Sequence, residues 1–220
     1  MPGTPTDVKF NIFKRINTGG LVLEPQEIRH ALFQGKPAQF IAELGKNKEF
    51  LEATESKIKT HRMLDRDFAN RFLAFYLFGY ENYTPDLDTF MSKAMASIYN
   101  MSQNELDKII HAYTEAMIVS KKIFQEEAFR KVYYNHKKLP PINKAIFDAL
   151  ATQIAVLSQK DRETLVSKGK IFKKGLSDLL INDVYFFTSV TSSTGDKNRV
   201  YHRHNEVKKL IRQTIEFYSK

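Results

Sequence analysis

SQNELDKIIHAYTEAM, residues 102–117, is the stretch that decides the fold class of this chain. Its apolar residues recur at the three- and four-residue intervals of one helix face; they are Leu106, Ile109, Ile110, Tyr113 and Met117. Ser102 and Glu105 have the spacing of a capping box, in which each side chain bonds the backbone N–H of the other residue. The stretch therefore predicts a long amphipathic helix over residues 104–125.

The same periodicity continues in both directions along the chain. It predicts further helices over residues 8–16, 25–34, 37–44, 65–78, 86–99, 143–157, 161–182 and 200–218. Pro25 and Pro37 stand at first helical positions, where proline is tolerated. Residues 184–190 are rich in β-branched and aromatic side chains, so this short segment is ambiguous between strand and helix.

Glycine and proline are scarce, with 9 and 7 residues in a chain of 220, which disfavours a fold of many short strands and tight turns. We therefore expect an all-α fold, a multi-helix domain of about nine helices. No stretch is long or biased enough to be a linker, so residues 1–220 are expected to form a single helical domain. Residues 1–7 are expected to be disordered or to be a start added for expression.

Composition limits the classes of function. The 34 Lys and Arg residues exceed the 25 Asp and Glu residues by nine, which favours polyanionic partners such as nucleic acid. The absence of cysteine excludes disulfides, thiolate zinc sites and cysteine nucleophiles. No apolar run approaches the ~20 residues of a membrane span, and the N-terminus lacks the pattern of a secretory signal. We expect a soluble cytoplasmic protein with no membrane partner.

FKRINTGGLVLEPQEIR, residues 13–29, contains a glycine turn between two predicted helices. Gly19 and Gly20 allow positive φ and leave backbone N–H groups uncovered, so the turn could hold an anion with help from Arg15 and Asn17. An ordinary glycine-closed helix corner, with polar residues as its caps, explains the same residues. Both interpretations stay open on the pattern alone.

Residues 13–29 resemble the signature of the GmrSD restriction-enzyme N-terminal family, a former domain of unknown function related to the ParB-like nuclease/NTPase fold. RMLDRDFANRF, residues 62–72, resembles a second family block, with Asp67 in place of the usual Glu. AFR at 128–130 and INKAIFDAL at 142–150 resemble its later helices. These blocks occur in the family's order from Phe13 onward.

The resemblance implies a nucleotide-pocket wall made by Arg15, Asn17, Thr18, Gly19, Gly20, Glu27 and Arg29. Complete family members are expected to use an NTP and Mg²⁺. The Asp-Gly-Gln-Gln-Arg motif that normally precedes these blocks is missing from the 220 residues, and no HNH nuclease module is recognisable. The resemblance thus implies the helical half of a larger α/β ParB-like domain: an expressed piece, a truncated reading frame or one subunit of a split protein. We assign no cofactor to this chain by itself and expect it to be inactive alone, with the missing half as its partner.

Charged residues within the second block have a structural explanation. Asp67 and Arg71 are spaced i, i+4 on a helix whose other residues are largely aromatic, so we expect a structural ion pair beside an aromatic core. Acid/base or metal chemistry at Asp65 and Asp67 is the alternative. The six histidines form no set with metal-ligand spacing, and no metal site is expected.

The last segment is the clearest basic region of the sequence. Its candidate nucleic-acid contacts are Lys197, Arg199, His202, Arg203, Lys208, Lys209 and Arg212. A basic helix docked by its apolar face could lie against a phosphate backbone, most simply that of DNA. The alternative is a solvated face on a terminal helix.

Two functions fit these observations best. The first is a fragment of a prokaryotic restriction or anti-phage defence protein of the GmrSD type, which contributes a helical nucleotide-pocket wall and a nucleic-acid-binding surface. The second is a non-catalytic helical module that binds DNA or docks on a protein. A self-contained enzyme is a third interpretation, and the sequence predicts neither its chemistry nor an oligomeric state.

Overall fold

The computed structural model describes residues 12, 22–133 and 138–216. Over these residues the chain forms eleven α-helices and no strand, so the all-α prediction is confirmed. The helices are α2 (Pro25–Leu32), α3 (Lys36–Gly45), α4 (Lys48–Ala53), α5 (Leu64–Phe78), α6 (Leu87–Ser97), α7 (Gln103–Phe124), α8 (Lys144–Ala155), α9 (Gln159–Ser167), α10 (Gly169–Asn182), α11 (Val184–Thr191) and α12 (Lys197–Glu216).

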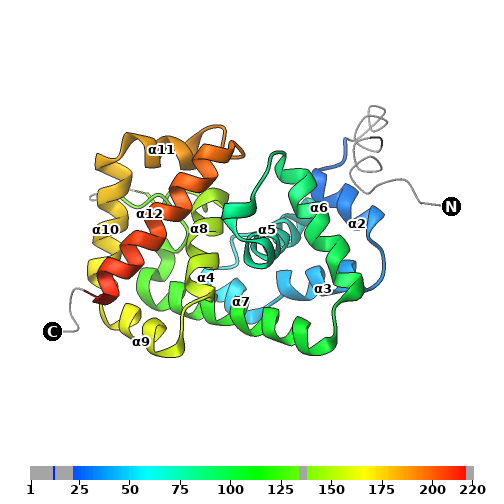
Figure 1. The fold of residues 1–220 in the computed structure, drawn as a ribbon, viewed down its shortest axis with the longest axis horizontal. Coiled ribbons are helices and arrows are strands. Elements are labelled where there is room, and N and C mark those ends of the chain that lie inside the picture. The colour runs from blue at the N-terminus through cyan, green and yellow to red at the C-terminus, as the bar shows by residue number, and fades with distance from the viewer. Residues whose placement is uncertain (1–11, 13–21, 134–137, 217–220) are drawn as a thin grey trace.

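The long helix α7 connects the two ends of the molecule (Figure 1). It packs mainly against α4 and α8, and it also contacts α9 and α10. Helix α8 packs against α5, α7 and α12, which joins the early helices to the late ones. Ser102 and Glu105 form the predicted capping box at the start of α7.

Aromatic side chains fill the interior where α5, α7 and α8 meet. The ring of Phe68 lies 5.0 Å from that of Phe147, and the ring of Phe72 lies 4.8 Å from that of Tyr113, both with T-shaped geometry. All four side chains are buried. Edge-to-face contacts are the favoured arrangement of aromatic pairs. The aromatic residues of α5 are therefore core, as the sequence indicates.

Three segments of the chain differ from the helices that the sequence predicts. Residues 184–190, which the sequence leaves ambiguous, are helical because Asp183 caps α11 by accepting a hydrogen bond from the Phe186 N–H at 2.8 Å. The predicted helix 161–182 is broken into α9 and α10 at Lys168. Helix α4 was not predicted; it begins at the cap Asn47. The predicted helix 8–16 lies outside the described residues except for Ile12.

No helix of the described residues combines the length and the hydropathy that a membrane span requires.

Candidate functional site

Four α-helices begin around one cleft of about 450 Å³. They are α2, α5, α6 and α8, which come from well-separated parts of the sequence. The cleft is lined by Glu24, Pro25, Gln26, His61, Arg62, Leu64, Asp67, Arg71, Leu87, Asp88, Met91 and Lys144. The N-terminus of a helix carries a partial positive charge and unpaired N–H groups. The cleft is therefore suited to an anionic ligand.

Local caps explain why the helices start at this cleft. Asp86 accepts a hydrogen bond from the Thr89 N–H at 2.7 Å to begin α6, and Asn143 accepts one from the Ile146 N–H at 2.9 Å to begin α8. Helix α5 has no such side-chain cap and is entered through Arg62 and Met63, which have φ values of 54° and 56°. Positive φ is costly for residues other than glycine and is concentrated at functional segments.

Arg29 is buried and binds two of the carboxylates that line the cleft, those of Asp67 and Asp88. Its side chain is 1% exposed, and its Nε atom donates to Gln26 at 2.8 Å. The two Nη atoms donate to Asp88 at 3.0 Å and to Asp67 at 3.1 Å. One buried guanidinium thus holds α2, α5 and α6 together.

Asp67 connects Arg29 to α8 as well. Its second carboxylate oxygen lies 2.7 Å from the Nζ atom of Lys144. Burial raises the pKa of Asp67, but Lys144, Arg71 and Arg29 together outweigh burial and hold the pKa below its ordinary value. The carboxylate is therefore ionised at neutral pH, and it neutralises cations from three helices.

The prediction that Asp67 pairs with Arg71 is wrong, because the partner of Arg71 is Asp148. Within the described residues, Arg71 donates two hydrogen bonds to Asp148 on α8, at 2.9 and 2.6 Å, and none to Asp67. Arg203 on α12 lies 3.4 Å from the same carboxylate. Arg71 still lowers the pKa of Asp67 through space. The two parallel hydrogen bonds match the planar guanidinium to the carboxylate of Asp148, which compensates for the burial of both charges.

The cleft unites three of the sequence blocks singled out above. Glu27 of the first block forms an ion pair with Arg62 of the second at 2.8 Å, and this contact lowers the pKa of Glu27. Lys144 and Asp148 belong to the later block at 142–150. Ion pairs connect all three blocks across up to 77 residues of sequence.

The predicted nucleotide-pocket residues divide into two groups. Glu27 and Arg29 are described; neither lines the cleft, but each forms an ion pair with a residue that does, Glu27 with Arg62 and Arg29 with Asp67. The others, Arg15, Asn17, Thr18, Gly19 and Gly20, lie outside the described residues. Sequence analysis did not single out Lys144, Asp88 or Asp148 as site residues. The available signal was that Lys144 and Asp148 lie within a block that resembles the family.

The basic C-terminal region is less uniform than its sequence indicates. Arg203 is fully buried, and its guanidinium donates to the carbonyl oxygen of Thr194 at 2.7 Å; its prediction as a nucleic-acid contact is wrong. Burial lowers the pKa of Arg203 to about 10, against the opposing effect of Asp148. The remaining candidates are at least partly exposed; they are Lys197, Arg199, His202, Lys208, Lys209 and Arg212.

Several of these exposed cations already have partners. Arg199 donates to the Ser192 hydroxyl at 2.7 Å, and His202 lies 3.2 Å from Asp183. Lys208 lies 3.4 Å from Glu81, and Lys209 lies 3.7 Å from Glu206. These are surface contacts with weak net stabilisation, so a polyanion can compete for the cations.

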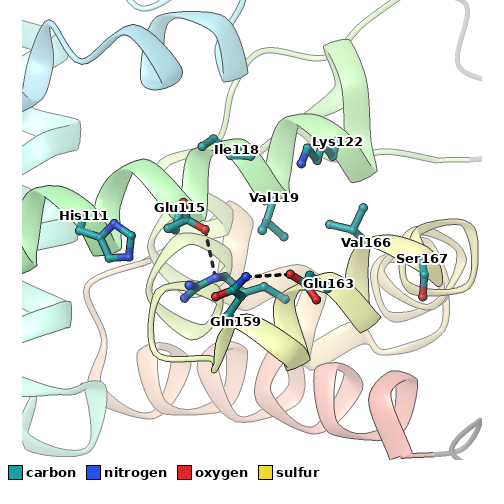
Figure 2. Close-up of a pocket in the computed structure, with 10 residues that line it drawn as sticks. His111, Glu115, Ile118, Val119, Lys122, Gln159, Glu163, Val166 and Ser167 are labelled. Carbon is teal, nitrogen blue, oxygen red and sulfur yellow. Dashed lines mark hydrogen bonds and ion pairs between the residues drawn. The ribbon is translucent and has the colours of Figure 1, made fainter.

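A second cavity, of about 470 Å³, lies between α7 and α9. Two of its acidic side chains have partners (Figure 2): Glu115 lies 3.3 Å from the Nε atom of Arg162, and Glu163 accepts a hydrogen bond from the neutral Gln159 at 3.0 Å. Four described helices begin at the first cleft, whereas the lining of this cavity includes the start of one, α9 at Gln159. We therefore take the first cleft as the candidate site.

In residues 22–133 and 138–216, no three His, Asp or Glu side chains are grouped as a metal site would require. The carboxylates of the candidate cleft are held by arginine and lysine side chains instead. No protein-family model, no curated protein and no solved structure matches this chain.

Proposed function

We propose that this chain is the helical part of a restriction or anti-phage defence protein of the GmrSD type. In this proposal the cleft at the starts of α2, α5, α6 and α8 forms one wall of a nucleotide pocket. The observation that carries it is the meeting of the three family-like blocks at this cleft, through the pairs of Glu27 with Arg62 and of Lys144 with Asp67. Blocks that act in one pocket must be adjacent in the fold.

The chemistry of the cleft supports phosphate as the ligand group. Lys144 is 44% exposed and stands at the first position of α8, so its ammonium can contact both Asp67 and an incoming anion. Backbone N–H groups at helix starts add further donors. Asp67 and Asp88 form ion pairs with Arg29, so neither carboxylate is free to hold a Mg²⁺ ion, which would be bound chiefly by the phosphates.

Titration with ATP or GTP, followed by backbone NMR, tests the proposal. We expect the amide signals of residues 62–67, 86–91 and 144–147 to shift, and Lys144→Met to weaken the effect several-fold. Lys48→Met is the matched control, because Lys48 is 80% exposed on α4 and does not line the cleft. Signals that do not move, or that move equally in Lys144→Met, would reject the pocket.

The chain alone should hydrolyse no NTP and cleave no DNA with Mg²⁺, because it lacks the Asp-Gly-Gln-Gln-Arg block that the family resemblance associates with nucleotide handling. Robust turnover that a point substitution in this chain abolishes would contradict the fragment proposal.

The second part of the proposal is a nucleic-acid-binding surface on α12. It is supported by Lys197, Lys209 and Arg212, which are exposed, and by Lys208, which is half-buried. The alternative function, a non-catalytic DNA-binding module, rests on the same surface and predicts nucleic-acid binding without any nucleotide effect.

A further inference from the structure

The outward face of α12 carries aromatic rings as well as cations. The outward face is the exposed side of this helix, formed by Tyr201, His202, Asn205, Lys208, Lys209 and Arg212. The opposite side of α12 is buried against the body through Val200, Val207 and Ile211. Successive residues of a helix are about 100° apart, so Tyr201 and His202 project toward the two sides of the outward face.

Two tyrosine rings are exposed at this face. Tyr201 is 48% exposed, and one side of its ring packs 5.6 Å from the ring of Tyr80. Tyr185, on α11, is 45% exposed, and its ring lies 4.5 Å from the His202 ring with T-shaped geometry. Helices α11 and α12 lie side by side (Figure 1), which brings Tyr185 next to the outward face. Neighbouring rings support both tyrosines while leaving nearly half of each in water.

Cations follow the rings toward the C-terminal end of α12. Lys208, Lys209 and Arg212 line a shallow groove of about 460 Å³ together with Asn205, Glu206 and Gln213. Arg212 is exposed and forms no ion pair with any described residue. Asn205 accepts a hydrogen bond from the Tyr80 hydroxyl at 2.6 Å, which orients its amide nitrogen as a donor.

We propose that the outward face of α12, with Tyr185, binds single-stranded nucleic acid, whose unpaired bases stack on Tyr185 and Tyr201 while its phosphates contact Lys209 and Arg212. This inference rests on the proposed nucleic-acid surface and specifies its ligand. Exposed aromatic rings beside cations suit unpaired bases, because every base has a stacking face. The bases of a duplex are already stacked on each other, so a duplex would use the cations alone.

Fluorescence anisotropy with a labelled thymidine oligonucleotide tests the ligand class, with a duplex of equal length in parallel. We expect the single strand to bind more tightly than the duplex. Replacing both tyrosines, as Tyr185→Leu with Tyr201→Leu, should weaken single-strand binding roughly tenfold or more and leave duplex binding unchanged. The double variant Tyr185→Phe with Tyr201→Phe keeps the aromatic rings and should bind as the parent does.

Tyr99→Leu is the matched control, because Tyr99 is 50% exposed and lies next to α6, away from α12. Circular dichroism establishes that each variant remains folded. Equal binding by the leucine variant and the parent, or equal loss in the phenylalanine variant, would overturn the stacking proposal. If salt-sensitive duplex binding persists in either case, the broader nucleic-acid surface survives. If the parent protein binds neither oligonucleotide, both the stacking proposal and the proposed nucleic-acid surface on α12 are rejected.

Discussion

Arg71 and Asp148 form a bidentate ion pair in the interior, with the Nη2 atom of Arg71 2.6 Å from an Asp148 oxygen. The Asp148 side chain is fully buried and that of Arg71 is 7% exposed. Burial lowers the pKa of Arg71, but Asp148 outweighs it and the pKa is raised overall. This pair fastens α5 to α8, and through Arg203 it reaches α12.

Asp148→Asn should therefore destabilise the protein strongly, because it leaves two buried guanidiniums without a carboxylate. We expect a loss of about 3–5 kcal/mol in the free energy of unfolding. Urea unfolding followed by circular dichroism measures the change. Asp107→Asn, at an exposed position on α7, is the control and should change stability by at most about 0.5 kcal/mol. Similar midpoints for the two variants would show that the pair contributes little.

Arg203→Ala should reduce stability by roughly 3 kcal/mol, because it creates a cavity and leaves the Thr194 carbonyl without its donor. Arg212→Ala should leave the unfolding midpoint nearly unchanged, since Arg212 is exposed. The comparison separates the core cation of α12 from a surface cation. If the Arg203→Ala protein were as stable as the parent but bound DNA more weakly, Arg203 would be a nucleic-acid contact, as the sequence predicts.

The surface cations of α12 should control the salt dependence of nucleic-acid binding. Each phosphate neutralised on duplex DNA contributes a slope of about −0.9 to the plot of log affinity against log salt. Replacing Lys208, Lys209 and Arg212 by alanine should lower affinity for all sequences alike and flatten this slope. Lys46, Lys48 and Lys57, replaced together, form the control, because all three lie near α4 instead. An unchanged slope in the α12 variant would mean that its cations do not meet phosphate.

His204 should make the protein acid-sensitive. Burial, with Arg203 nearby, lowers the pKa of His204 well below 6.5. The unfolded chain then binds a proton that the folded chain does not, so stability falls as the pH drops below about 6.5. Between pH 7.5 and 5.5 this single group should remove at most about 1.4 kcal/mol, the limit in which folded His204 stays neutral throughout. His204→Gln should lose that dependence and His111→Gln, at an exposed site, should keep it; chemical denaturation at both pH values makes the comparison.

Ser102→Ala should weaken the start of α7 by about 1 kcal/mol, because the Glu105 N–H loses its acceptor. Ser102→Asp keeps a capping oxygen and should restore most of the stability. Thermal unfolding of the two variants provides the measurement. If the aspartate variant melts as early as the alanine variant, the cap contributes little to the fold.

Local patterns predicted most of the helices because the determinants lie within a few residues of each other. The capping box of Ser102 with Glu105, and proline at the first position of α2, are both read directly from neighbouring residues. The break between α9 and α10 is different. Gly169 lies against Ile123 of α7, with only 3.3 Å between a Cβ at that position and the Ile123 side chain, so a tertiary contact shapes this junction.

The candidate site was harder to predict, because tertiary contacts between distant residues determine it. The sequence pattern pairs Asp67 with Arg71 through their i, i+4 spacing, whereas the partner of Arg71 in the structure, Asp148, is 77 residues away. It placed Arg203 outside because a charged residue in a basic run is normally solvated. The buried carboxylate of Asp148, on α8 and thus four helices earlier in the chain, reverses that preference.

The four helix starts at the cleft separate ligand recognition from folding. Glu24, His61 and Leu87 stand where chain segments enter helices, and their side chains are at least partly exposed. The interior is built from residues further along the same helices, such as Phe68 and Phe147. Exchanging the entry residues can therefore change which anion the cleft accepts while the helical frame stays the same, so one frame can serve many specificities.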